Sequence, residues 1–61
     1  MNEQSISVTD ALTGEDAVVI VRAVKGTIAI CLSLETDGDA EIFFSPNDFQ
    51  NLLSVLQTFE Q

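Results

Sequence analysis

Two apolar runs that flank a Lys-Gly pair constrain the fold of this chain more than any other feature. The runs cover residues 17–24 and 27–35, and Lys25-Gly26 stands between them. The first run is nearly continuous and rich in β-branched residues, and the second alternates cleanly, which is typical of strands. A two-residue turn at Lys25-Gly26 therefore predicts a β-hairpin in which Val24 lies opposite Thr27.

This register divides the hairpin into two faces, because successive side chains of a strand point to opposite sides of the sheet. The apolar face, which we expect to lie against a helix, consists of Ala17, Val19, Val21, Ala23, Ile28, Ile30, Leu32 and Leu34. The mixed face consists of Val18, Ile20, Arg22, Val24, Thr27, Ala29, Cys31 and Ser33. The mixed face is too apolar for an ordinary solvated surface. Either a second copy of the chain or the N-terminal segment packs on it, or it binds a ligand or partner.

The candidate binding or interface residues all lie on the mixed face: Val18, Ile20, Arg22, Val24, Cys31 and Phe43. Phe43 and Phe44 are adjacent and point to opposite faces, and the sequence leaves open which one faces the helix. We expect the guanidinium of Arg22 to meet a carboxylate across a subunit interface or an anionic ligand, because an unpaired buried charge is costly. The alternative is an exposed arginine whose stem lies along apolar neighbours.

The remaining strands are predicted from shorter signals. Residues 1–4 form a polar tail, and Ile6 and Val8 alternate with polar residues as in a short edge strand. The segment 36–39 contains Asp-Gly, a strong hairpin signal, and residues 40–44 are the next predicted strand.

Ser45-Pro46 predicts the start of a helix, because serine caps helices and proline suits the first helical position. One apolar stripe follows at helical spacing: Phe49, Leu52, Leu53, Leu56 and Phe59. The expected fold is thus a single α+β domain over residues 1–61. It is an antiparallel sheet of three to four strands with one C-terminal amphipathic helix packed on one face.

A domain of 61 residues buries a small core and needs a further source of stability. The single cysteine excludes an internal disulfide, and the lack of histidine and of a Cys-x-x-Cys pair excludes a structural zinc site. We therefore expect a homo-oligomer, with a homodimer as the commonest form. The N-terminus has no basic region followed by an apolar run, and the longest apolar stretch is too short to span a bilayer, so we expect a cytoplasmic protein.

Charge narrows the possible functions. Ten acidic residues against two basic ones give a formal net charge of −8 at pH 7. Direct binding to nucleic acid or to an anionic membrane needs clustered Lys or Arg, so neither is expected. Without histidine, and with its carboxylate pairs in solvated turns, the chain is not expected to be an enzyme. Cys31 is expected to be a buried, inert thiol, and the acidic segment 35–41 a solvated turn without metal; no cofactor is expected.

Residues 18–56 resemble the single-stranded DNA-binding domain of the positive-cofactor-four and Whirly type. The similarity lies in Val-x-Val-Arg-x-x-Lys-Gly over residues 19–26, in Ile28-x-Ile30-x-Leu32, and in a strand that ends at Ser45-Pro46 before an amphipathic helix. The resemblance implies a four-stranded sheet with a helix that dimerises. Only the expectation about the fold is carried over, because that family binds DNA with a basic groove and stacking aromatics, and this sheet offers Arg22, Lys25 and at most one phenylalanine against ten acidic residues.

Three functions remain open. The first is a small acidic, non-catalytic protein, a homo-oligomer that docks on a basic surface of another protein as an inhibitor or nucleic-acid mimic. The same charge also has a simpler explanation, which is solubility. The second is an oligomer that sequesters a small molecule on the mixed face, with Arg22 as its anion-binding group. The third is a degenerate single-stranded nucleic-acid-binding-like domain.

Overall fold

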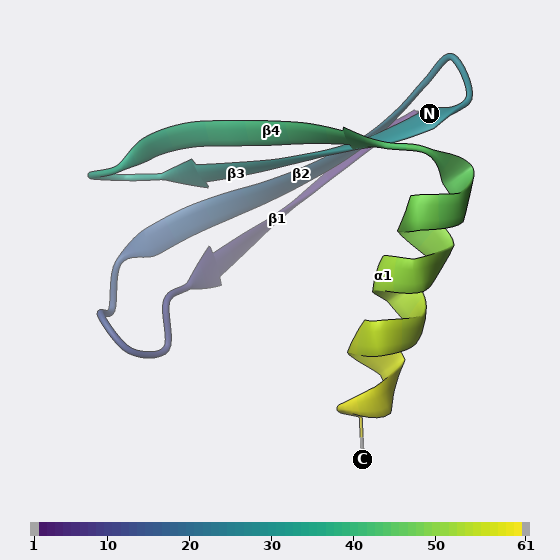
Figure 1. Cartoon of the computed structure of the whole chain (residues 1–61). Coiled ribbons are helices and arrows are strands. Elements are labelled where there is room, and N and C mark those ends of the chain that lie inside the picture. The colour runs from purple at the N-terminus through teal and green to yellow at the C-terminus, as the bar shows by residue number, and fades with distance from the viewer. Residues whose placement is uncertain (1, 61) are drawn as a thin grey trace.

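The strands follow one another in space in the order in which they follow in the chain. The computed structural model describes residues 2–60. It contains β1 (Glu3–Thr9), β2 (Asp16–Val24), β3 (Thr27–Leu34), β4 (Gly38–Phe44) and α1 (Pro46–Thr58). The four strands form one antiparallel sheet in the order β1-β2-β3-β4, and the helix follows at its end (Figure 1). The predicted α+β fold, with one C-terminal helix packed on the sheet, is confirmed.

The central hairpin has the predicted register. Val24 lies opposite Thr27, and the pairing continues without a bulge to Ala17 opposite Leu34. Lys25 and Gly26 both have positive φ angles, 47° and 81°, as a two-residue turn that matches the strand twist requires. The apolar and mixed faces of the hairpin are therefore the ones that the sequence predicts.

The β3–β4 connection decides which phenylalanine faces which side. Leu34 pairs with Gly38, so the loop has three residues, and Gly38 takes a positive φ of 81° that suits glycine. Phe44 then pairs with Ile28 on the apolar face, and Phe43 pairs with Ala29 on the mixed face. Strand β4 also adds Ile42 to the apolar face and Glu41 to the mixed face.

Strand β1 is longer than the short strand predicted around Ile6 and Val8. It begins at Glu3, within the segment expected to be a polar tail, and pairs with β2 along its whole length. Ile6 and Val8 lie opposite Val19 and Ala17 and so belong to the apolar face. Its other side gives the mixed face a row of small polar residues: Ser5, Ser7 and Thr9. Met1, the first residue of the expected tail, lies outside the described residues.

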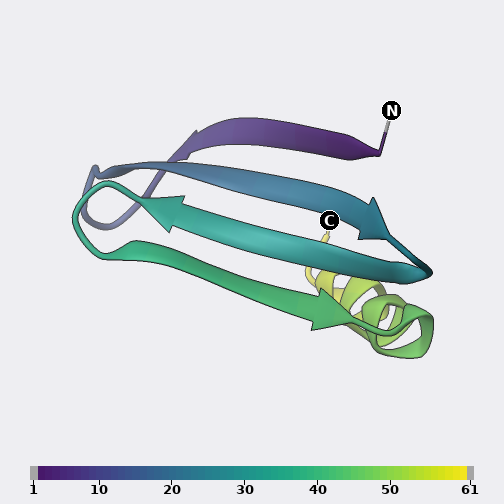
Figure 2. The same cartoon turned by 90° about the horizontal axis from the view of Figure 1, so that it is seen from above.

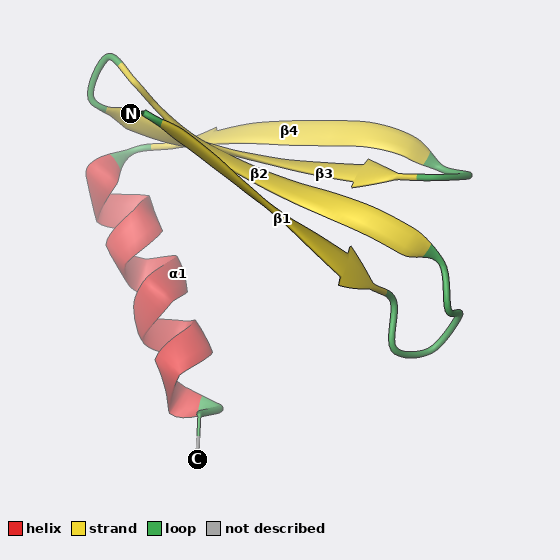
Figure 3. Cartoon of the chain, turned by 180° about the vertical axis from the view of Figure 1, so that it is seen from behind, coloured by secondary structure: helices red, strands yellow, loops and turns green. Residues whose placement is uncertain are grey.

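The helix begins as predicted. Ser45 is its N-cap and accepts a hydrogen bond from the Asp48 backbone N–H (Oγ···N 3.1 Å), with Pro46 in the first helical position. The helix leaves the end of β4 and runs away from the sheet at a steep angle (Figures 1 and 3). Only the first part of its apolar stripe is therefore half-buried, namely Phe49, Leu52 and Leu53.

The second part of the stripe is exposed, with Leu56 at 57% and Phe59 at 77% of their full accessible surface. The apolar face of the sheet is similarly open, with Ile6 at 61%, Leu32 at 48% and Ile42 at 60%. Among the described residues, Ala29 on the mixed face is the single fully buried apolar side chain. One copy of the chain therefore has no closed hydrophobic core.

Candidate functional site

Charge is distributed unequally between the two ends of the sheet. In a meander, the β1–β2 and β3–β4 loops lie at the same end, and the β2–β3 turn and the start of the helix lie at the opposite end (Figure 2). Six of the ten acidic residues belong to the first end, here called the loop end: Asp10, Glu15, Asp16, Glu35, Asp37 and Asp39. The two basic residues, Arg22 and Lys25, lie towards the opposite end. The molecule is thus electrically polarised along its strands.

A carboxylate fastens the two loops of this end together. The Oε2 atom of Glu15 accepts hydrogen bonds from the backbone N–H and from the hydroxyl of Thr36, both at 2.7 Å. These bonds stabilise the ionised form and hold the pKa of Glu15 below its ordinary value of 4.5. The loop end is therefore a joined surface rather than two independent loops.

The first loop is shaped by Asp10. Its Oδ1 atom accepts hydrogen bonds from the backbone N–H groups of Leu12 and Thr13, at 2.8 and 3.2 Å, which is the usual geometry of an Asx turn. Because both donors favour the charged carboxylate, the pKa of Asp10 is lowered from 3.8. Asp10 and Glu15 thus stay ionised to a lower pH than free carboxylates of the same type.

A shallow hollow of about 420 Å³ lies beside the loop end. Most of its lining residues are on the mixed face, namely Ser7, Thr9, Asp16, Val18 and Ser33, and Glu35 of the β3–β4 loop adds a second carboxylate. The hollow has two carboxylates and three hydroxyls but no basic residue. Such a surface suits an ammonium or guanidinium group, which needs oxygen acceptors around it.

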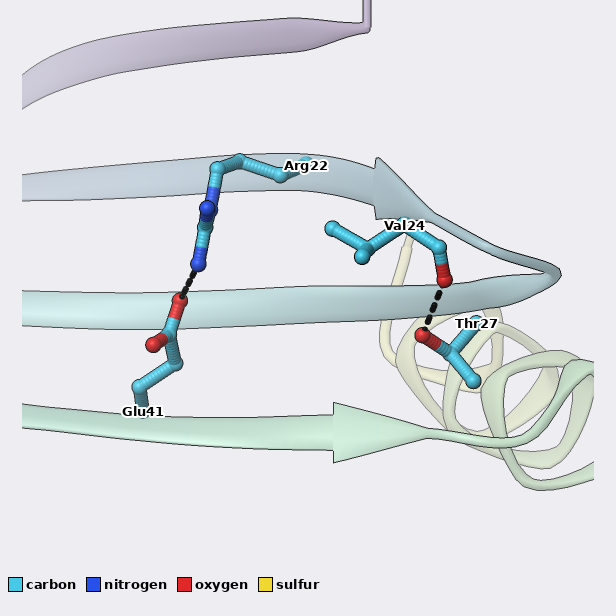
Figure 4. A network of polar contacts seen from close by, with 4 residues as sticks. All are labelled: Arg22, Val24, Thr27 and Glu41. Carbon is cyan, nitrogen blue, oxygen red and sulfur yellow. Dashed lines mark hydrogen bonds and ion pairs between the residues drawn. The ribbon is translucent and has the colours of Figure 1, made fainter.

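The mixed face is crossed by an ion pair within the chain. Arg22 of β2 reaches over β3 and donates from Nη2 to Oε2 of Glu41 on β4, at 2.5 Å (Figure 4). The hydrogen bond and the charge of Glu41 raise the pKa of Arg22. Ala29 lies opposite Arg22 and Phe43 in the ladder, so the longer neighbours cover it. In Figure 4 the helix lies behind the sheet and the ion pair in front of it, which places the helix on the side of the apolar face.

The six residues predicted as a binding or interface set do share one face. Val18, Ile20 and Val24 are half-buried, as are Arg22 and Cys31, and Phe43 is 55% exposed. The carboxylate that Arg22 meets comes from its own chain, whereas we expected one from a second subunit or a ligand. Thr27 closes the neighbouring turn by donating from its hydroxyl to the carbonyl oxygen of Val24, at 2.6 Å (Figure 4).

Sequence reasoning treated the loop-end carboxylates as separate solvated turns and did not bring them together. Their proximity could have been found from topology alone, because alternate loops of an antiparallel meander meet at one end of the sheet. Glu41 was missed for a different reason: its side of the sheet depends on the length of the β3–β4 loop.

Two further observations concern residues 2–60 only. No group of three or more cysteine, aspartate or glutamate side chains in this range is placed to hold a metal ion. Helix α1 has neither the length nor the apolar character needed to cross a membrane.

No protein-family model, curated protein or solved structure matches this chain. The resemblance to single-stranded DNA-binding domains therefore stays a prediction.

Proposed function

We propose that this chain is a small, non-catalytic binding protein that docks its acidic loop end on a basic surface of another protein. The observation that carries the proposal is the polarised charge, with six carboxylates at one end of the sheet and both cations towards the other. A field of this shape attracts a basic partner and also orients it, because the approach of the loop end is favoured over the approach of the opposite end.

Local structure supports the same end. The Glu15–Thr36 hydrogen bonds hold the two loops in one arrangement before any partner arrives. A preformed surface loses less conformational entropy on binding than two free loops would. The neighbouring hollow offers the carboxylates of Asp16 and Glu35 to a lysine or arginine side chain of the partner.

The test uses a lysine- and arginine-rich peptide as the probe and calorimetry at low and physiological salt as the measurement. A Glu35→Gln/Asp37→Asn variant removes two charges from the loop end. A Glu3→Gln/Glu60→Gln variant removes the same number from other parts of the chain. We expect the first variant to bind the peptide about tenfold more weakly, and the second to bind it nearly as the unaltered chain does.

Equal weakening by both variants would contradict the proposal. It would mean that the peptide responds to net charge alone, and that the acidic residues serve solubility. Binding that does not weaken as salt is raised would contradict it as well, since surface charge contacts are screened by salt.

A further inference from the structure

We propose that two copies of this chain associate through their apolar faces, with the C-terminal half of each helix covering the sheet of the other copy. Here the apolar face includes the residues that β1 and β4 add to it: Ile6, Val8, Ala40, Ile42 and Phe44. This inference does not depend on the acidic loop end or on any partner that binds there.

The first argument is the area that one copy leaves exposed. The chain has an accessible surface of 4988 Å². A compact monomer of 6.6 kDa exposes about 3,900 Å², so the excess is roughly 1,100 Å². A stable interface of standard size buries about 800 Å² on each partner. The excess therefore has the size that one dimer interface removes.

The shape of the chain agrees with this. Its radius of gyration is 12.8 Å, whereas a compact domain of 61 residues has about 10.5 Å. The difference arises because the helix points away from the sheet on the side of the apolar face (Figures 1 and 3). The sheet and the helix thus present two apolar surfaces that pack on each other only in part within a single chain.

The second argument is complementarity. Beyond the part that its own helix covers, the sheet exposes Ile6, Leu32 and Ile42, and beyond the part that rests on the sheet, the helix end exposes Leu56 and Phe59. The exposed helix end of one copy can therefore cover the exposed sheet residues of another. A two-fold axis satisfies both at once, because in such an interface the same patch serves both subunits.

The third argument is charge. Each copy has a net charge of −8, so two copies repel one another over most of their surfaces. The strand positions of the apolar face contain no charged residue, and α1 contains only Asp48, in its first turn; Glu60 follows the C-cap residue Phe59. This is the surface on which two acidic chains can meet. A basic partner, in contrast, is attracted to the loop end.

The test compares two neighbouring residues of β4 that are similarly exposed but point to opposite faces. Ile42→Lys places a charge on the apolar face, and Phe43→Lys is the matched control on the mixed face. In sedimentation experiments at micromolar concentration, we expect the unaltered chain and Phe43→Lys to have twice the mass of 6.6 kDa, and Ile42→Lys to have the monomer mass. A monomeric unaltered chain would overturn the proposal, and so would dissociation by Phe43→Lys in place of Ile42→Lys.

A second measurement applies if Ile42→Lys fails to fold. The melting temperature of the unaltered chain should rise with protein concentration, because association stabilises the folded form. A melting temperature that does not change with concentration would refute the dimer.

To locate the interface, a Leu56→Cys chain is mixed with an Ile42→Cys chain, both lacking Cys31, and treated with a bismaleimide linker. We expect a cross-linked product between these two chains. A Phe43→Cys chain, also lacking Cys31, is the control for the mixed face. A product that forms only with Phe43→Cys would place the interface on the mixed face and contradict the proposal.

Discussion

At the scale of single residues, the mixed face is organised around Ala29. Its small side chain is fully buried because Arg22 and Phe43 flank it and the ion pair to Glu41 crosses the strand beside it. A larger side chain at this position would displace the arginine and open the pair. The small size of Ala29 thus leaves room for the side chain of Arg22 to pass from β2 to Glu41 on β4.

We predict that Ala29→Leu lowers the free energy of unfolding by about 1–3 kcal/mol, the usual cost of overpacking a filled site. Urea unfolding followed by circular dichroism measures this change. Ala11→Leu, in the exposed β1–β2 loop, introduces the same side chain without crowding and should leave stability nearly unaltered. Equal effects of both variants would show that Ala29 is not sterically confined.

Glu15 provides a prediction about pH. Its pKa is lowered in the folded chain from 4.5, so its ionised form contributes stability above that value and loses it as pH falls through the folded pKa. The unfolding midpoints of the unaltered chain and of Glu15→Gln should therefore differ most at neutral pH and converge as pH drops below 4.5. Glu60→Gln, which removes one exposed charge, is the control. A gap of constant size would show that the Thr36 hydrogen bonds do not contribute.

At the scale of elements, the features that short sequence motifs determine could be predicted. The β2–β3 register follows from the Lys25-Gly26 turn, and the helix start follows from Ser45-Pro46, and both are confirmed. The β3–β4 register depends on one residue of loop length. A two-residue turn at Asp37-Gly38 would place Glu41 opposite Leu34 on the apolar face, whereas the observed three-residue loop places it opposite Cys31. The ion pair of Arg22 could not be predicted without that loop length.

The path of the helix was less predictable still. The stripe from Phe49 to Phe59 indicates which side of the helix is apolar, but not how closely the helix approaches the sheet. The observed angle between helix and sheet leaves Leu56 and Phe59 exposed. The spacing of apolar residues along the sequence does not determine this angle. The packing of one copy was therefore the least predictable part of the fold.

The helix cap gives a prediction at this scale. Replacing Ser45 with alanine removes the side-chain acceptor of the Asp48 N–H, which should lower stability by about 1 kcal/mol. Thermal unfolding followed by circular dichroism is the measurement. Ser54→Ala, on the exposed side of the same helix, is the matched control, and it should be neutral or slightly stabilising because alanine has the higher helix propensity. A larger loss with Ser54→Ala would contradict the capping role of Ser45.

At the scale of the whole molecule, we expect the positions of the charges to affect stability more than the net charge does. The loop-end carboxylates repel one another, while Asp48 lies in the first turn of α1, where the helix dipole favours an anion. Two substitutions that change the net charge equally should therefore change stability in opposite directions. Net charge alone predicts the same direction for both.

We expect Asp37→Asn to raise the melting temperature at low ionic strength and Asp48→Asn to lower it. Both effects should shrink as salt is added, because the ions screen exposed charges. Differential scanning calorimetry at two salt concentrations measures them. If both variants raise the melting temperature, net charge governs stability and the polarised distribution has no energetic effect.

The order of the strands also bears on how fast the molecule forms. Every strand pairs with its neighbour in sequence, and the connection between two paired strands has at most six residues. Folds with such local contacts cross their folding barrier quickly. Each hairpin can therefore form as soon as its second strand has been synthesised. In the dimer proposed above, the encounter between two folded chains would then be the slow step, and its rate would rise with the concentration of the chain.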